Sequence, residues 1–299
     1  MSQTALTVGT EYLDRKITGT GTEDNPWIIG SAADDTDENM FQNFLDAVYT
    51  SSAYVKLARD IDVSQSKTYR EGLGTYITTN AAKIYADESK AAIKNLITKE
   101  KLLDIYSLSI ITNIQFLNCI VNNVSGPINS RDSNNSMSYC DFSLLLRGTG
   151  ADSNIGHIMD HNISINHCSI DVKIINGLIS GSTFNSLKNC QINIDTAVSS
   201  AANASNPIFK NCEKCGITGN FMIKAASASI YLLGSCSYCY IAGTASTTGT
   251  NVNLVILNST NCYLCLETDG KASVSSSNWK ITSDQLKSKE YLYEIGFLP

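Results

Sequence analysis

Ten cysteines are the first residues in this sequence that could do chemistry. Six of them form C-x-x-C pairs, at Cys212/Cys215, Cys236/Cys239 and Cys262/Cys265. Two consecutive pairs could offer four thiolates to a zinc ion, and a single pair could be a thiol redox site. A buried cysteine also packs as a small apolar side chain. The sequence therefore leaves three interpretations: zinc ligands, redox thiols or core residues.

All three histidines fall in one short segment, "GHIMDHNISINHC", which follows the polar stretch "LRGTGADSNIGH". Function often lies on such loops. The residue types there could bind a metal or transfer protons, and the candidates are Arg147, Asp152, His157, Asp160 and His161. The alternative interpretation is a polar loop in which the histidines and Arg147 only make hydrogen bonds.

Catalytic carboxylates are not evident in the sequence. Glycoside hydrolysis needs two carboxylates close together, and a calcium-dependent lyase needs several acids with a base. Residues 105–280 hold nine acids, and only Glu267 and Asp269 lie as close as two residues apart. The net charge of −6 and the absence of clustered Lys and Arg exclude binding to nucleic-acid phosphates. We therefore expect no catalytic residue, no cofactor and no metal.

The spacing of the cysteines indicates an internal repeat. One cysteine per segment recurs after 21, 28, 22, 25, 24 and 26 residues, at Cys119, Cys140, Cys168, Cys190, Cys215, Cys239 and Cys265. The residue two positions after each is apolar except Glu267, and the residue three positions before is Phe116, Met137, Ile165, Leu187 or the first Cys of a pair. Residues two apart share one face of a strand. The pattern thus favours a column of buried, reduced cysteines over zinc or redox sites.

Repeats of this length with Asn, Gly and Ser between short strands are typical of an all-β parallel β-helix, in which each repeat is one coil. Asn118, Asn189 and Asn211 stand just before a marker position, where we expect turns. A β-sandwich or jelly roll would explain the short strands but not the aligned apolar positions. The consensus of leucine-rich repeats is missing.

The ends of such a stack need caps. Met40, Phe41, Phe44, Leu45 and Val48 follow helical spacing after a possible N-cap at Asp35 or Thr36. A second helix is expected after Thr282 or Ser283, through Leu286, Tyr291 and Leu292. We divide the chain into an N-terminal arm (1–25), a cap (26–75), coils (76–280) and a C-terminal helix with a tail (281–299). The arm should be loose unless a partner holds it.

"GTGTEDNPWIIGS", followed by an amphipathic helix and by "AYVKLARDIDV", resembles the opening of β-helical proteins of bacteriophage virions and bacterial surfaces. The ending "ITSDQLKSKEYLYEIGFLP" is similar to the C-terminal helix of such virion proteins. The resemblance covers the two ends of the chain and brings no catalytic residue with it. It implies a right-handed parallel β-helix with short capping helices at both ends.

The expected function is that of a virion structural protein: a fibre, spike or capsid-decorating subunit that is not an enzyme. Contact with host surface glycans is a further expectation. The alternatives are a polysaccharide lyase or depolymerase spike and a bacterial surface adhesin. The sequence shows no secretory signal and no apolar stretch long enough to span a membrane, so we expect synthesis in the host cytoplasm and a place in the virion. The resemblance implies a homotrimer, and the weakly charged residues 220–260 would suit its interface. The arm would contact other virion proteins.

Overall fold

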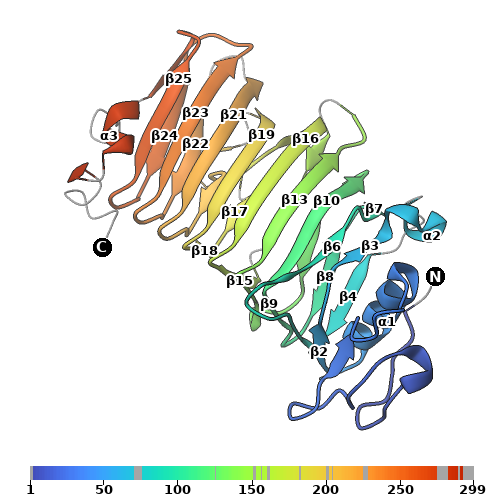
Figure 1. Cartoon of the computed structure of the whole chain (residues 1–299). Coiled ribbons are helices and arrows are strands. Elements are labelled where there is room, and N and C mark those ends of the chain that lie inside the picture. Colours follow the sequence, from blue (N-terminus) through green and yellow to red (C-terminus); the bar gives the residue numbers. More distant parts are fainter. Residues whose placement is uncertain are drawn as a thin grey trace.

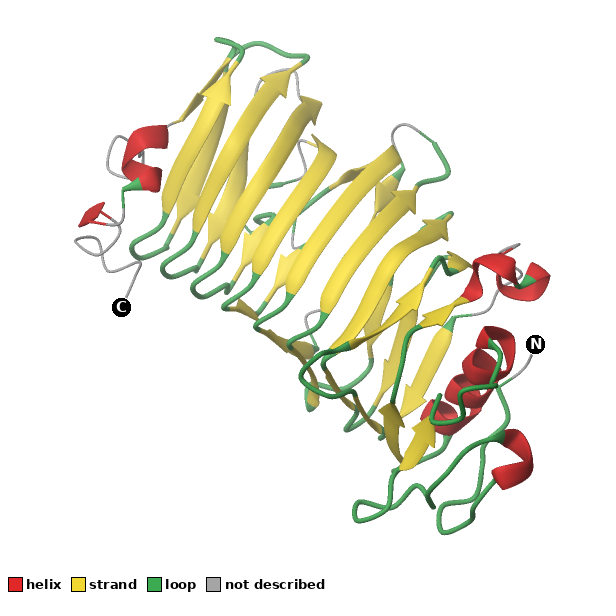
Figure 2. Ribbon diagram, in the orientation of Figure 1, coloured by secondary structure: helices red, strands yellow, loops and turns green. Residues whose placement is uncertain are grey.

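The computed structural model describes residues 3–70, 76–124, 126–150, 153–155, 157–159, 162–181, 183–199, 202–203, 205–224, 228–274, 282–288 and 290–291. The chain winds into a right-handed parallel β-helix, as the sequence predicts (Figure 1). Figure 2 shows the strands stacked side by side in one elongated body, with helices near both ends. Every pairing between its named strands is parallel.

Four sheets form the faces of the helix, and all run along its axis. The first sheet contains β1 (Trp27–Ile29), β2 (Tyr54–Leu57), β5 (Lys83–Tyr85), β9 (Ile110–Thr112), β12 (Asn135–Ser138), β15 (Ile163–Asn166) and β18 (Leu187–Lys188). The second, the longest, contains β3 (Ile61–Asp62), β6 (Ala91–Lys94), β7 (Ile97–Lys99), β10 (Ile114–Asn122), β13 (Asp141–Arg147), β14 (Asn154–Ile155), β16 (Ser169–Ile179), β19 (Gln191–Ser199), β21 (Gly216–Lys224), β23 (Tyr240–Thr247) and β25 (Tyr263–Thr268).

The two remaining sheets are shorter. The third contains β4 (Ile77–Asn80), β8 (Leu103–Tyr106) and β11 (Ile128–Ser130). The fourth contains β17 (Phe184–Asn185), β20 (Phe209–Lys210), β22 (Ser229–Gly234), β24 (Val252–Leu257) and β26 (Ala272–Val274). Inward side chains of all four sheets join one continuous apolar core. Because β1, β2 and β3 already belong to the stacked sheets, the coils begin at Trp27 and not at residue 76 as we expected.

A column of cysteines lies in this core, and the strand register defines its members. They are Cys140, Cys168, Cys190, Cys215, Cys239 and Cys262, and Ile114 precedes them in the same position. The amide that follows each cysteine donates to the carbonyl of the cysteine one coil earlier, as from Ser169 to Cys140. The first cysteines of two pairs, Cys212 and Cys236, continue a second column after Met137, Ile165 and Leu187. The interpretation of the paired cysteines as core residues is confirmed for these members.

Two of the seven marker cysteines were wrongly aligned. Cys119 pairs with Leu144 in the second half of β10, beyond a bulge at Asn118 (φ 55°), and Phe116 stands in the column of Phe142. Cys265 pairs with Ala242 and is half-buried, while Cys262 aligns with Cys239. This register buries Leu264 and Leu266, whereas placing Cys265 inward would turn both leucines to the surface. Asn118, Asn189 and Asn211 all have left-handed backbone; Asn189 and Asn211 lie in turns as expected, whereas Asn118 forms the bulge inside β10.

None of the ten cysteines is joined in a disulfide. Burial raises the pKa of Cys119 to about 12, which keeps this thiol protonated and unsuited to metal binding. Among the described residues, no group of three or more His, Cys, Asp and Glu side chains is arranged to hold a metal ion.

Replacing Cys215 by Ser is expected to lower the free energy of unfolding by about 1–3 kcal/mol, because a hydroxyl is poorly solvated in an apolar column. Cys215 is fully buried, and its thiol contacts the carbonyl oxygens of Leu187 and Glu213, each at 3.4 Å. Cys265→Ser is the matched control, since Cys265 lies outside the column, and its effect should stay within about 0.5 kcal/mol. Urea unfolding of both variants measures the difference. Equal losses would contradict the register described above.

The helices predicted near the two ends of the chain are present as α1 and α3, but α3 ends at Lys287, earlier than expected. α1 (Asp37–Tyr49) begins after Thr36, whose hydroxyl accepts from the Asn39 amide at 3.2 Å, and it buries the five predicted apolar residues. α2 (Lys67–Arg70) is a single turn next to the 3₁₀ turn at Val63–Gln65. α3 (Ser283–Lys287) begins after Thr282, which forms a capping box with Gln285. Leu292, which we expected on this helix, lies outside the described residues.

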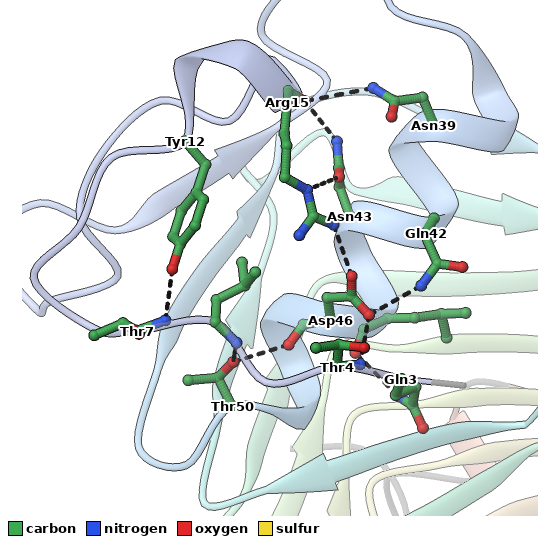
Figure 3. Close-up of polar contacts among 12 residues, drawn as sticks. Gln3, Thr4, Thr7, Tyr12, Arg15, Asn39, Gln42, Asn43, Asp46 and Thr50 are labelled. Carbon is green, nitrogen blue, oxygen red and sulfur yellow. Dashed lines mark hydrogen bonds and ion pairs between the residues drawn. The ribbon is translucent and has the colours of Figure 1, made fainter. Parts of the chain in front are cut away.

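The N-terminal segment, residues 3–25, is not a loose arm. It folds back over α1 (Figure 3) and includes the 3₁₀ turn Leu13–Arg15. Asp46 on α1 is the centre of its contacts: one carboxylate oxygen accepts from the Thr4 amide at 2.8 Å, and the other binds Arg15 at 2.7 Å. Leu6 and Ile17 are buried, and the Trp27 indole donates to the Thr10 carbonyl. The segment is thus part of the cap, and the expected boundary at residue 25 is wrong.

Candidate functional site

Two of the five candidates chosen from sequence, Arg147 and His157, lie among the described residues. Arg147 is exposed at the end of β13, and His157 is exposed shortly after β14. Asp152, Asp160 and His161 lie outside the described residues. His167, the third histidine, occupies a left-handed turn, where its ring stacks on Tyr139 with centroids 4.9 Å apart. A binding site at these residues therefore stays a prediction.

A different feature is the best candidate site: a groove on the outer face of the second sheet. Three hollows of about 350, 330 and 470 Å³ succeed one another along this face. The first two share Asn118 and Ile120, and the third crosses β16, β19, β21 and β23 further along the same sheet. The groove therefore runs along the axis of the β-helix across neighbouring coils.

Bends in the strands create this groove. Asn95 and Asn118 interrupt the second sheet near its N-terminal end with φ values of 63° and 55°, and Asn176 does so in β16 with 52°. Gly219 and Gly243 bend β21 and β23 at φ 153° and 129°. A Cβ atom on Gly219 would lie 1.9 Å from the Ile194 carbonyl oxygen, so only glycine fits there.

A hydrogen-bonded row of polar side chains lines the third hollow. The Asn220 amide donates to Asp195 at 2.7 Å, and the Thr244 hydroxyl donates to the Asn220 carbonyl oxygen at 2.7 Å. A second row repeats this order at Asp171, Asn193 and Thr218. Because a carboxylate only accepts, it fixes the orientation of the amide next to it and so of the whole row. The rows present ordered donors and acceptors at the 4.7–4.9 Å spacing of strands.

Apolar and charged groups complete the lining. Met222 is 50% exposed and Ile175 is 37% exposed, an unusual degree for large apolar side chains. Lys173 stands opposite Asp195 in the register of β16 and β19, with Asp171 two residues away on the same face. Strand spacing and rise place the Cα atoms of Asp171 and Asp195 about 8 Å apart.

Sequence reasoning missed this group of Asp171, Lys173 and Asp195. The signal was available, because Asp171 and Lys173 follow Cys168 by three and five residues, and Asn193 and Asp195 follow Cys190 by the same intervals. Aligning the coils on these two cysteines, which belong to the true column, superposes Lys173 on Asp195. The two acids are 24 residues apart in the chain, so spacing along the chain does not reveal the group.

Neither a protein-family model nor a curated protein sequence matches this chain. In the described part of the chain, no helix has both the length and the apolar character needed to cross a membrane. The chemistry of the groove is therefore inferred from its own residues.

Proposed function

We propose that the protein is a structural β-helical subunit of a bacteriophage virion, of the fibre, spike or capsid-decorating type, and that its groove binds surface glycans without cleaving them. The observation that carries the glycan assignment is the row Asp195–Asn220–Thr244 beside the exposed Met222. Sugars present hydroxyls that both donate and accept, together with apolar C–H faces, and this lining offers partners for each. A groove that crosses several coils suits an extended polymer better than a small molecule.

The virion assignment rests on the resemblance of the two chain ends to virion proteins, and the cap supports it. "NPWII" provides β1, with Trp27 fully buried, and the amphipathic stretch after it forms α1. The resembling residues thus have a structural role here. A homotrimer is part of the proposal, and light scattering tests it: a stable 32.4 kDa monomer would contradict self-association. Stoichiometric presence in purified particles tests the virion assignment itself.

Glycan binding can be tested with the variant Asn220→Ala, which removes the central member of the row. We expect about a tenfold loss of affinity for a bacterial surface polysaccharide, since one lost hydrogen bond to a ligand contributes about 1.4 kcal/mol. Asn253→Ala is the matched control, because Asn253 is also an exposed asparagine with a hydroxyl partner, Ser273, but belongs to the fourth sheet. Binding measured on an array of isolated polysaccharides should be unaffected by the control. If Asn220→Ala binds like the original protein, the groove is not the glycan site.

A depolymerase is the second candidate, and one observation favours it. Asp171 and Asp195 lie on the same face of adjacent strands with their Cα atoms about 8 Å apart, and inverting glycosidases hold two carboxyl groups about 6.5–9.5 Å apart. The discriminating measurement is the release of new reducing ends from bound polysaccharide. Release that Asp195→Asn abolishes would replace the structural proposal by the enzymatic one, whereas binding without release supports the former.

A further inference from the structure

A separate cluster on the outer face of the third sheet has cations in excess. Asp104 on β8 is only 1% exposed although it points outward, because charged side chains cover it. Its first carboxylate oxygen accepts from Asn129 at 2.7 Å and from Arg131 Nε at 3.2 Å. The second accepts from Arg131 Nη2 at 3.0 Å and from Lys101 at 3.2 Å. One carboxylate thus holds two cations in fixed positions.

The donors of this cluster outnumber its acceptors. A guanidinium has five N–H groups and an ammonium three. Arg131 uses one edge on Asp104, and its Nη1 has no hydrogen-bond partner among the described residues. Lys101 uses one of its three N–H groups on the same carboxylate. Asp104 already accepts four hydrogen bonds, so it cannot satisfy the rest.

Two tyrosine rings support the cations. The Arg131 guanidinium lies over the Tyr106 ring, 4.3 Å from its centroid, and the Lys101 ammonium lies 5.5 Å from the centroid of Tyr76. These contacts hold both groups beside the sheet, and the Arg131 side chain remains 48% exposed. The cluster has a local net charge of +1 in a protein of net charge −6. Fixed cations with unused donors recognise planar or tetrahedral oxyanions.

We propose that Lys101 and Arg131, positioned by Asp104, form a binding site for an oxyanion, either a carboxylate or a phosphate group. This site lies on a different sheet from the groove, and the inference does not depend on the proposed function. Acidic sugars and phosphate-bearing polymers both offer this chemistry. Because the cations are prearranged, binding requires little reordering of side chains.

Isothermal titration calorimetry at low salt tests the site with glucuronate and glycerol 3-phosphate, and with glucose and glycerol as their neutral counterparts. We expect at least one anion to bind with a Kd of about 1 mM, and we expect added salt to weaken it. Binding of glucuronate would identify an acidic sugar as the ligand, and binding of glycerol 3-phosphate would identify a phosphate-bearing polymer. Glucose and glycerol should not displace it.

The variant Arg131→Lys keeps a cation beside Asp104 but removes the fork of N–H groups, so affinity should fall about tenfold. Lys188→Gln is the control. Lys188 forms an exposed ion pair with Glu213 on another face, so its replacement should leave the affinity for the anion unchanged. The inference is overturned if neither anion binds to the unaltered protein at about 10 mM, far above the expected Kd. It is also overturned if Arg131→Lys binds like the original, or if Lys188→Gln weakens binding equally.

Discussion

A chain that begins at Asn25 is expected to lose its folded structure. The truncation removes Leu6 and Ile17 from the core, where each contributes about 1.5–3 kcal/mol. It also removes Thr4 and Arg15 from Asp46 and exposes the face of α1 on which the segment lies. The loss of about 3–6 kcal/mol from the two apolar side chains alone is a large part of the whole stability of an ordinary domain, about 5–15 kcal/mol.

Circular dichroism and the soluble yield of the truncated chain measure this effect. Leu13→Ala in the full chain is the control, because Leu13 lies in the same segment but is 62% exposed, and its effect should be within about 0.5 kcal/mol. The loss of stability caused by Asp46→Asn should lie between those of the truncation and of Leu13→Ala, since this variant removes the charge but keeps the segment. A truncated chain with the spectrum and melting temperature of the full protein would show that residues 3–25 are a removable attachment after all.

Replacing Asp104 by Ala is expected to lower the free energy of unfolding by about 1–3 kcal/mol, since it removes the hydrogen bonds to Arg131 and Lys101 and leaves these partly exposed cations without a counter-charge. Burial by itself would raise the pKa of Asp104, but hydrogen bonds from Arg131 and Asn129 and the charge of Lys101 bring it below the usual value. The carboxylate therefore contributes stability above its unfolded pKa, near 4, and this contribution is lost as the pH falls through the lower folded value.

Urea unfolding at pH 7 and at a series of lower pH values tests this prediction. The difference between the original protein and Asp104→Ala should be greatest at pH 7 and should shrink below about pH 4, where the carboxylate of the unfolded chain becomes protonated. Glu213→Ala is the control, because its ion pair with Lys188 is exposed and contributes less than about 1 kcal/mol. A difference that stays constant down to pH 2 would indicate that Asp104 acts through packing and not through its charge.

The sequence by itself determined the architecture and much of the core. The recurrence of apolar residues around Cys140, Cys168, Cys190, Cys215 and Cys239 predicted stacked parallel coils, and the strand pairings confirm those alignments. The spacing of Met40, Phe41, Phe44, Leu45 and Val48 predicted the buried face of α1. Both patterns are local, because the side-chain period of a strand or helix fixes which residues face inward.

Only the tertiary structure decided the alignment at the two ends of the cysteine column, the place of residues 3–25 and the groove. Each depends on contacts between residues distant in the chain. The bulge at Asn118 and the burial of Leu264 and Leu266 shifted Cys119 and Cys265 out of the column, and Asp46 anchors a segment whose own periodicity is weak. The row Asp195–Asn220–Thr244 comes together because coils of unequal length still stack in register. The period within a strand is encoded locally, whereas the register between strands is set by which pairing buries the most apolar surface and satisfies the buried polar groups.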